Sequence, residues 1–195
     1  QWSEGFRLGF GQPIPSPIEL CDTDNDGILD GTDGKGSLDP KVDSDTTANF
    51  ELGAKISAMD NRLTVNTALF RIDWQDIPVT VIEHSPDCPA DQRVRINAGE
   101  ARSQGVEIEA RYHATDRLLL TFSTSYTDTE FLDNGIRTEG ERLPLSPRIN
   151  GSLGVQYDFD WLGYPSFIST DYSYIGDYLN NDGFAASQPI DGYGK

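Results

Sequence analysis

An aspartate-rich stretch, residues 22–33, is the part of this 195-residue chain with the spacing of a metal-binding loop. Side-chain oxygens stand at loop positions 1, 3, 5, 9 and 12, a backbone carbonyl is available at position 7, and Gly27 stands at position 6. Calcium takes six to eight oxygen ligands, and glycine permits the sharp turn that points the first carboxylates inward. The spacing predicts a Ca²⁺ site, and the alternative is a solvated acidic loop that only resists aggregation. The predicted ligands are Asp22, Asp24, Asp26, Ile28 through its carbonyl, Asp30 and Asp33.

The end of this stretch departs from a helix–loop–helix calcium site. Asp33 takes position 12, where such sites carry a bidentate glutamate, and no amphipathic helix flanks the loop. The stretch resembles instead the calcium loops of thrombospondin type 3 repeats and dockerins.

The two cysteines, Cys21 and Cys88, both fall in long connections between predicted strands. The first four strands would bring these connections near each other, and an oxidising compartment would let the thiols pair. A disulfide is therefore one expectation. The alternatives are two independent thiols, or partners outside this part of the protein.

Catalysis and nucleic-acid binding find no support in the sequence. His84 and His113 stand far apart, and neither joins a nucleophile or a carboxylate at catalytic spacing. Glu107 and Glu109 are spaced like an acid–base pair, but any polar strand face produces such pairs. The formal net charge is −17, whereas phosphates require a basic surface. We therefore expect a protein that is not an enzyme and binds no nucleic acid.

Most of the chain alternates apolar and polar side chains with a period of two, which is typical of strands. Residues 149–159 show it best, with Leu153, Val155 and Tyr157 on one face and Ser152 and Gln156 on the other. The pattern predicts an all-β, antiparallel meander of seven strands, with an eighth beginning at Tyr193. The expected strands are 2–10, 49–58, 63–74, 106–113, 118–127, 149–159 and 168–178.

Composition and connection lengths favour a membrane barrel over a soluble sandwich. Hydrophobic residues make up 36% of the chain and the mean hydropathy is −0.48, which leaves little material for a core between two sheets. Tight links at 60–62, 115–117 and 160–165 alternate with long ones at 11–47, 83–96 and 132–147. Outer-membrane barrels have short turns on the periplasmic side and long loops outside. Aromatic residues near the strand ends, such as Trp161, fit an interfacial girdle.

Five segments, in order, resemble successive barrel strands of TonB-dependent outer-membrane receptors. They are Asn49–Lys55, Leu63–Phe70 with Trp74–Ile77, Asn97–Arg102 leading to Gly105–Glu109, Tyr126–Phe131, and Arg142–Arg148. The resemblance covers roughly residues 45–195, and residues 4–7 extend it to the start.

The resemblance implies a segment of a 22-stranded barrel in the outer membrane of a Gram-negative bacterium. Family members carry a plug domain inside the barrel and a segment that engages TonB, and they import siderophores, cobalamin, carbohydrates or similar scarce solutes. Residues 1–195 would then be a piece without the plug or the terminal strand, unable to transport by itself. Its implied partners are lipid, the plug and remaining strands of the same protein, TonB, and a small solute. The residues expected to face the lumen and the plug are Lys55, Arg71, Glu107, Glu109 and Arg111.

Two other functions stay open at this stage. The chain could belong to an outer-membrane barrel or adhesin that carries a calcium-binding loop and transports nothing. It could also be a secreted calcium-binding β-sandwich, whose apolar faces would stack together in a dry interior.

Overall fold

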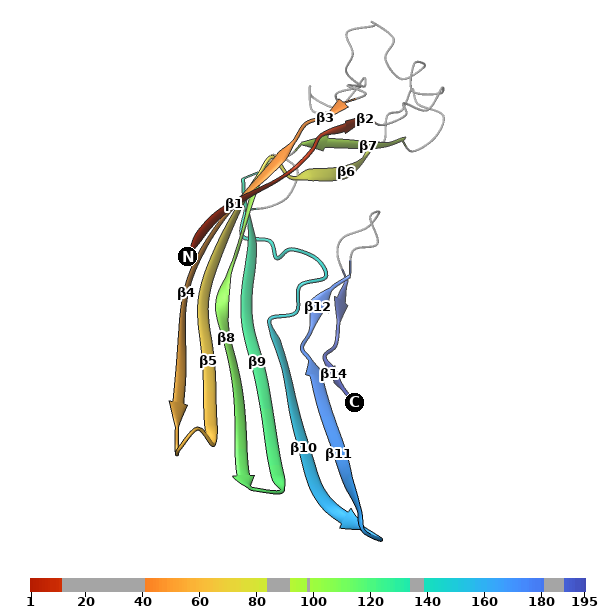
Figure 1. Cartoon of the computed structure of the whole chain (residues 1–195). Helices are drawn as coiled ribbons and strands as arrows, with labels where there is room; N and C mark the ends of the chain where they lie inside the picture. Colours follow the sequence, from red (N-terminus) through yellow and green to blue (C-terminus); the bar gives the residue numbers. More distant parts are fainter. Residues whose placement is uncertain (12–40, 84–91, 98, 134–138, 181–187) are drawn as a thin grey trace, which may run out of the picture.

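The chain forms one long sheet of antiparallel strands (Figure 1). The computed structural model describes residues 1–11, 41–83, 92–97, 99–133, 139–180 and 188–195, and in them every regular element is a strand. The sheet has eight strands, and each neighbour in space is the next sheet strand along the chain. The predicted all-β meander is thereby confirmed. Its strands are β1 (Trp2–Arg7), β4 (Asp45–Ala58), β5 (Leu63–Gln75), β8 (Glu100–Thr115), β9 (Leu118–Asp133), β10 (Ile149–Trp161), β11 (Tyr164–Ile175) and β14 (Tyr193–Gly194).

Three small two-stranded sheets lie within the long connections, at one end of the main sheet. They pair β2 (Phe10–Gly11) with β3 (Lys41–Val42), β6 (Pro78–Glu83) with β7 (Gln92–Asn97), and β12 (Tyr178–Leu179) with β13 (Pro189–Ile190). Phe10 and Tyr178 end predicted strands, whereas the other residues of these small sheets were not assigned to strands. β3 and β13 have two residues each, which is too few for a period of two to be recognised. The strands β8 and β9 are also longer than predicted, at 16 residues each.

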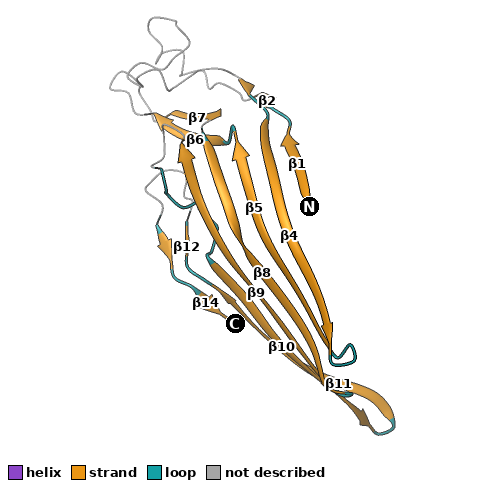
Figure 2. Cartoon of the chain, turned by 90° about the vertical axis from the view of Figure 1, so that its left-hand side faces the viewer, coloured by secondary structure: helices purple, strands orange, loops and turns teal. Residues whose placement is uncertain are grey.

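All three tight turns lie at the same end of the sheet (Figures 1 and 2). The β4–β5 turn uses left-handed backbone at Met59, Asp60 and Asn61, and the β10–β11 turn uses it at Leu162 and Gly163. Two consecutive residues with positive φ form the turn whose twist matches that of a hairpin. The tight turns and the long connections therefore occupy opposite ends, as the link lengths predicted.

The register separates the two faces of the sheet. Residues directly opposite in adjacent strands share a face, and one such row runs through Leu52, Leu69, Val106, Tyr126 and Ile149. This apolar face is uncovered: Leu52 is 72% exposed and Ile168 is 64% exposed. The secreted sandwich is excluded, since no second layer meets these side chains in the described part of the chain.

Aromatic rings cover glycines in neighbouring strands. A Cβ on Gly105 would lie 2.9 Å from the Phe70 ring and would also meet the Tyr126 carbonyl. In the same way the Tyr174 hydroxyl would lie 2.7 Å from a Cβ on Gly192, and the Tyr172 hydroxyl stands over Gly194. The absence of side chains at these positions leaves room for the rings, and the contacts of Tyr172 and Tyr174 add to the pairing of β11 with the short strand β14.

Candidate functional site

The polar face carries four of the five residues predicted to face the lumen. Lys55 of β4, Asn66 of β5 and Glu109 of β8 form one row across three neighbouring strands. Glu107 and Arg111 lie on the same face of β8, two residues before and two residues after Glu109. Lys55, Glu107 and Glu109 line a shallow hollow of about 410 Å³ that includes Gly53 and Ala68. Small hydroxyl side chains continue this face across the next strands, namely Ser123, Ser125, Ser152 and Ser173.

The prediction for Arg71 was wrong. Its register partners are Phe50 in β4 and Gln104 in β8, which places Arg71 on the apolar face in line with Leu69. The reason is the period of two, because Leu63, Val65, Leu69 and Arg71 all share the same parity in β5. The positive charge of Arg71 suggested that it faces the lumen, but the alternation of side chains along β5 places it on the apolar face.

Arg71 belongs to a group of ion pairs on the apolar face. These ion pairs lie at the end of the strands that is nearest the long connections. Arg71 Nε lies 2.9 Å from Asp73 Oδ2, and Arg102 Nε lies 2.9 Å from Asp73 Oδ1. Arg102 also approaches Glu130, at 3.9 Å. We call Arg71, Asp73, Arg102 and Glu130 the ion-pair belt. Charged side chains are tolerated near membrane interfaces far better than at the bilayer midplane, so the belt sits at one edge of the apolar band.

A polar cluster on the opposite face joins the first three sheet strands near the long connections. Arg7 donates two hydrogen bonds to the Asp45 carboxylate, at 3.0 and 2.6 Å, and Trp74 Nε1 donates a third at 2.7 Å. The Arg7 guanidinium also lies 6.0 Å from the centre of the Trp74 ring. Asp45 is buried, whereas Arg7 is partly exposed. This rim cluster, Arg7, Asp45 and Trp74, ties β1 to β4 and β5.

Residues 139–148, the described part of the β9–β10 connection, pack against the same end of the polar face. Ile77, Ala101 and Phe131 form a small buried core, and Leu143 and Trp74 pack on it. The Phe131 amide donates to the Glu141 carbonyl at 2.9 Å, and the Leu145 amide donates to the Leu179 carbonyl at 2.8 Å. These hydrogen bonds fix Glu141 to β9 and Leu145 to β12.

Arg142 holds the far side of this connection to the end of β11. Its Nη1 donates to the Asp177 carboxylate at 2.9 Å, and its Nη2 donates to the Asp177 and Ser146 carbonyls. The hydrogen bond from Arg142 lowers the pKa of Asp177 below its ordinary value, because it stabilises the charged carboxylate. The contact with Arg142 therefore favours the charged form of Asp177.

The hairpins β2–β3 and β6–β7 are joined to each other. The Asp43 amide donates to Asn97 Oδ1 at 2.7 Å, and Asn97 Nδ2 donates to the carbonyls of Asp43 and Asp76. The Arg95 guanidinium lies 5.7 Å from the centre of the Phe10 ring. The segments 12–40 and 84–91 therefore leave from two hairpins that lie side by side.

The calcium ligands predicted at Asp22, Asp24, Asp26, Ile28, Asp30 and Asp33 lie outside the described residues, as do Cys21 and Cys88. Within the described residues, no group of three or more His, Cys, Asp or Glu side chains could hold a metal ion. The described part also contains no helix long and apolar enough to cross a membrane.

A single antiparallel sheet with one bare apolar face, one polar face and tight turns at one end is the wall of a membrane β-barrel. The family model "TonB dependent receptor-like, beta-barrel" matches residues 1–195. The chain therefore belongs to this family, whose members are transport receptors of the Gram-negative outer membrane and not enzymes. In such a barrel the apolar face of the wall contacts lipid and the polar face borders the interior.

Individual relatives support the assignment. The metal-pseudopaline receptor CntO of Pseudomonas aeruginosa is 31% identical over 134 residues, which is 68% of this chain and 18% of that protein. The probable TonB-dependent siderophore receptor PiuA of Acinetobacter baumannii is 27% identical over 153 residues, covering 73% and 19% of the two chains. The crystal structure of the ferric yersiniabactin uptake receptor FyuA from Yersinia pestis shares the fold, with a TM-score of 0.69 and 18% identity, over 99% of this chain and 25% of that one. The chain spans about a fifth of the length of the curated relatives it matches.

The rim cluster generates a test of how β1 is held. In the full-length receptor, Asp45→Asn should lower the free energy of unfolding by about 1–3 kcal/mol, because two donors lose a charged acceptor. Amide hydrogen exchange in β1 should accelerate, since Arg7 is the side chain that ties it to the rim.

Asp43→Asn is the matched control, because the Lys41–Asp43 ion pair is exposed on both sides and contributes about 0–1 kcal/mol. Equal effects of the two substitutions would contradict a specific role for the rim cluster.

Proposed function

We propose that the full-length protein is an outer-membrane receptor that imports a scarce solute, and that this solute is a metal chelate. The observation that carries the proposal is the family match over the whole chain. The finer assignment is supported by the relatives' names, since CntO is a metal-pseudopaline receptor and PiuA a probable siderophore receptor. The alternative, a non-transporting barrel or adhesin, has no comparable support.

In this function the chain supplies wall strands and outer loops. The lumen face would pack against the plug domain, with Lys55, Glu107, Glu109 and Arg111 as its charged contacts. The exposed carboxylates of Glu107 and Glu109 suit basic groups on the plug. The outer loops and the apex of the plug would bind the solute, and the energy would come through TonB, which engages another part of the protein.

The outer strands of the sheet need partners for this role. β1 and β14 each have one neighbour in the eight-stranded sheet. Hydrocarbon cannot satisfy free backbone N–H and C=O groups, so further barrel strands must pair with both edges. We therefore expect transport only from the full-length protein and not from residues 1–195 alone.

Uptake in cells tests the proposed function. A strain without this receptor should grow poorly when metal is supplied only as the chelate, and the intact gene should restore growth and uptake of the labelled metal. Glu107→Gln with Glu109→Gln should reduce uptake while leaving chelate binding at the surface intact, because these carboxylates would contact the plug and not the solute.

A strain with inactive TonB is the control, and it should bind the chelate without importing it. Uptake that persists without TonB, or a receptor that binds none of a panel of metal chelates, would reject the proposal.

We also propose that residues 22–33 bind Ca²⁺ in the outer loop. Support comes from the donor spacing and from Gly27 at the turn position. Calorimetry of the full-length receptor at millimolar Ca²⁺ should show binding that Asp24→Asn with Asp26→Asn abolishes and Asp43→Asn does not. If the receptor with its native loop shows no heat of Ca²⁺ binding, residues 22–33 are only a solvated acidic loop and the proposal is rejected.

A disulfide between Cys21 and Cys88 is a further proposal. Support comes from the side-by-side hairpins β2–β3 and β6–β7, from which the two cysteine-containing segments leave. In unreduced full-length receptor both thiols should be inert to a maleimide, and both should react after reduction. Two reactive thiols before reduction would contradict the bond.

A further inference from the structure

We infer that Asn97 is a positioning residue for solute binding. Its side-chain amide fixes the hairpins β2–β3 and β6–β7 in one relative arrangement, and the affinity of the receptor for its solute depends on that arrangement. The inference rests on the proposed function, because it treats these hairpins as part of the solute-binding end of the barrel. It adds a single side chain that sets how tightly the solute is held.

Asn97 ends β7 and lies where three connections of the wall meet. Its Oδ1 accepts a hydrogen bond from the Asp43 amide at 2.7 Å, and its Nδ2 donates to the Asp43 carbonyl at 3.1 Å. Nδ2 also donates to the Asp76 carbonyl at 2.7 Å. A primary amide carries an acceptor and two donors on one planar group. Asn97 therefore bridges the β1–β4 connection and the β5–β6 bend at the same time.

The contact with Asp43 takes the place of a backbone ladder between the two hairpins. In a hydrogen-bonded antiparallel pair, a residue both donates one backbone hydrogen bond to its partner and accepts one from it. The Asn97 side chain makes both of these bonds with Asp43. β3 and β7 lie in different two-stranded sheets, so no backbone ladder joins them. The side chain thus supplies the link that the two backbones do not.

The bond to Asp76 fixes the bend from which β6 leaves the wall. Asp76 follows Gln75, the last residue of β5 that pairs with β8, and it has a left-handed φ of 57°. Its carbonyl accepts from Asn97 Nδ2 instead of from a neighbouring strand. The Ile77 amide donates to the Gly99 carbonyl at 3.4 Å in the same bend. These contacts set the direction of the hairpin β6–β7.

The backbone on which Asn97 docks is closely packed from its other side. Val42, which precedes Asp43, is fully buried. A Cβ on Gly9 would lie 2.5 Å from the Val42 carbonyl oxygen and 3.1 Å from the Asp43 backbone. Asp43 is therefore held against the chain that follows β1, and an amide bound to it fixes the position of the hairpin β6–β7 relative to β2–β3.

A fixed arrangement of the hairpins favours binding, because a solute that contacts both needs both in place. When only a fraction of the receptor has the competent arrangement, the apparent Kd equals the intrinsic Kd divided by this fraction. Each hydrogen bond of this kind changes such an equilibrium by about two- to tenfold. Transport after binding uses the plug and TonB, so the affinity should change and the saturated uptake rate should not.

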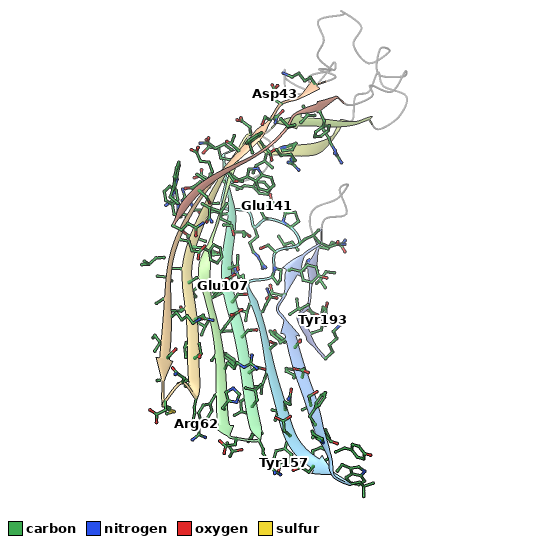
Figure 3. The ribbon with its side chains drawn as sticks, in the orientation of Figure 1. Asp43, Arg62, Glu107, Glu141, Tyr157 and Tyr193 are labelled. Atoms are coloured by element: carbon green, nitrogen blue, oxygen red, sulfur yellow. The ribbon has the colours of Figure 1, made fainter. Side chains whose placement is uncertain are left out.

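Two substitutions at Asn97 in the full-length receptor test this role. Asn97→Ala removes all three hydrogen bonds without adding a charge, and Asn97→Asp removes both donor bonds at constant size. Asn61→Asp is the matched control, because it makes the same chemical change in the β4–β5 turn. This turn contains Arg62, which lies at the end of the sheet opposite Asp43 (Figure 3).

The probes are radioactive iron(III) chelates with hydroxamate, catecholate or carboxylate ligands. Equilibrium binding to cells with inactive TonB gives the Kd and the number of sites. Both Asn97 variants should raise the Kd about tenfold, and Asn61→Asp should not. The number of sites, and the saturated uptake rate in cells with active TonB, should stay at their native values. Fewer sites at an unchanged Kd would indicate only a folding defect and would overturn the inference.

Hydrogen exchange follows the junction without any solute. Exchange of the Asp43 amide should accelerate in Asn97→Ala, because this amide loses its acceptor, and exchange in β10 and β11 should not change. Unchanged exchange at Asp43 would contradict the clamp.

Gly9→Ala disturbs the same junction from its other side, because its Cβ displaces the backbone at Val42 and Asp43. It should also raise the Kd, and its combination with Asn97→Ala should raise the Kd by less than the product of the two separate effects. Full multiplication of the two effects would place them at separate contacts and overturn the inference.

The binding measurements are repeated after reduction, since a Cys21–Cys88 bond would hold the hairpins together without Asn97. A native Kd for Asn97→Ala both before and after reduction overturns the inference and leaves the proposed function standing. A native receptor that binds none of the chelates rejects the proposed function itself, and with it the role of Asn97.

Discussion

The structure depends on one constraint, which is that every backbone N–H and C=O group inside a bilayer needs a partner within the protein. The long strands meet this constraint by pairing without interruption. In β4 and β5 the register runs from Thr46 opposite Gln75 to Ala58 opposite Leu63 without a break. In the pairing of β8 with β9 the irregularities lie only near the strand ends, between Glu100 and Ala101 and between His113 and Thr115. Unbroken pairing also keeps the lipid-facing and lumen-facing sides separate along the whole wall.

A sheet of this kind needs no conventional core in its membrane-spanning part. Its large apolar side chains are exposed on one face because hydrocarbon, and not a second protein layer, surrounds them. Burial within the described residues is concentrated where the wall rises toward the long connections, around Ile77, Ala101 and Phe131. The end of the wall that carries the long connections is thus stabilised by side-chain packing, whereas the membrane-spanning part depends on hydrogen bonding between strands and on contact with lipid.

The two ends of the wall serve different purposes. At the end with tight turns, Arg62 and Arg117 link successive hairpins through the carbonyl of His113 and the carboxylate of Asp160. At the other end, the rim cluster and the contacts of Asn97 hold the bases of the long loops. A rigid base for each loop suits a receptor, because binding residues on loops need a fixed scaffold.

The sequence by itself determined the strand pattern, the apolar face and the alternation of short and long links, since each follows from a period of two and from local turn chemistry. It also placed Lys55, Glu107, Glu109 and Arg111 on one face. The prediction was wrong for Arg71, because Arg71 was assigned to the polar face for its charge although its position in the alternation of β5 places it on the apolar face. Only the tertiary structure decided the pairing of Arg7 with Asp45, 38 positions apart, and the docking of Asn97 on Asp43, 54 positions apart. Such contacts depend on register between strands, which no local pattern encodes, and so they become visible only when the strands are laid side by side.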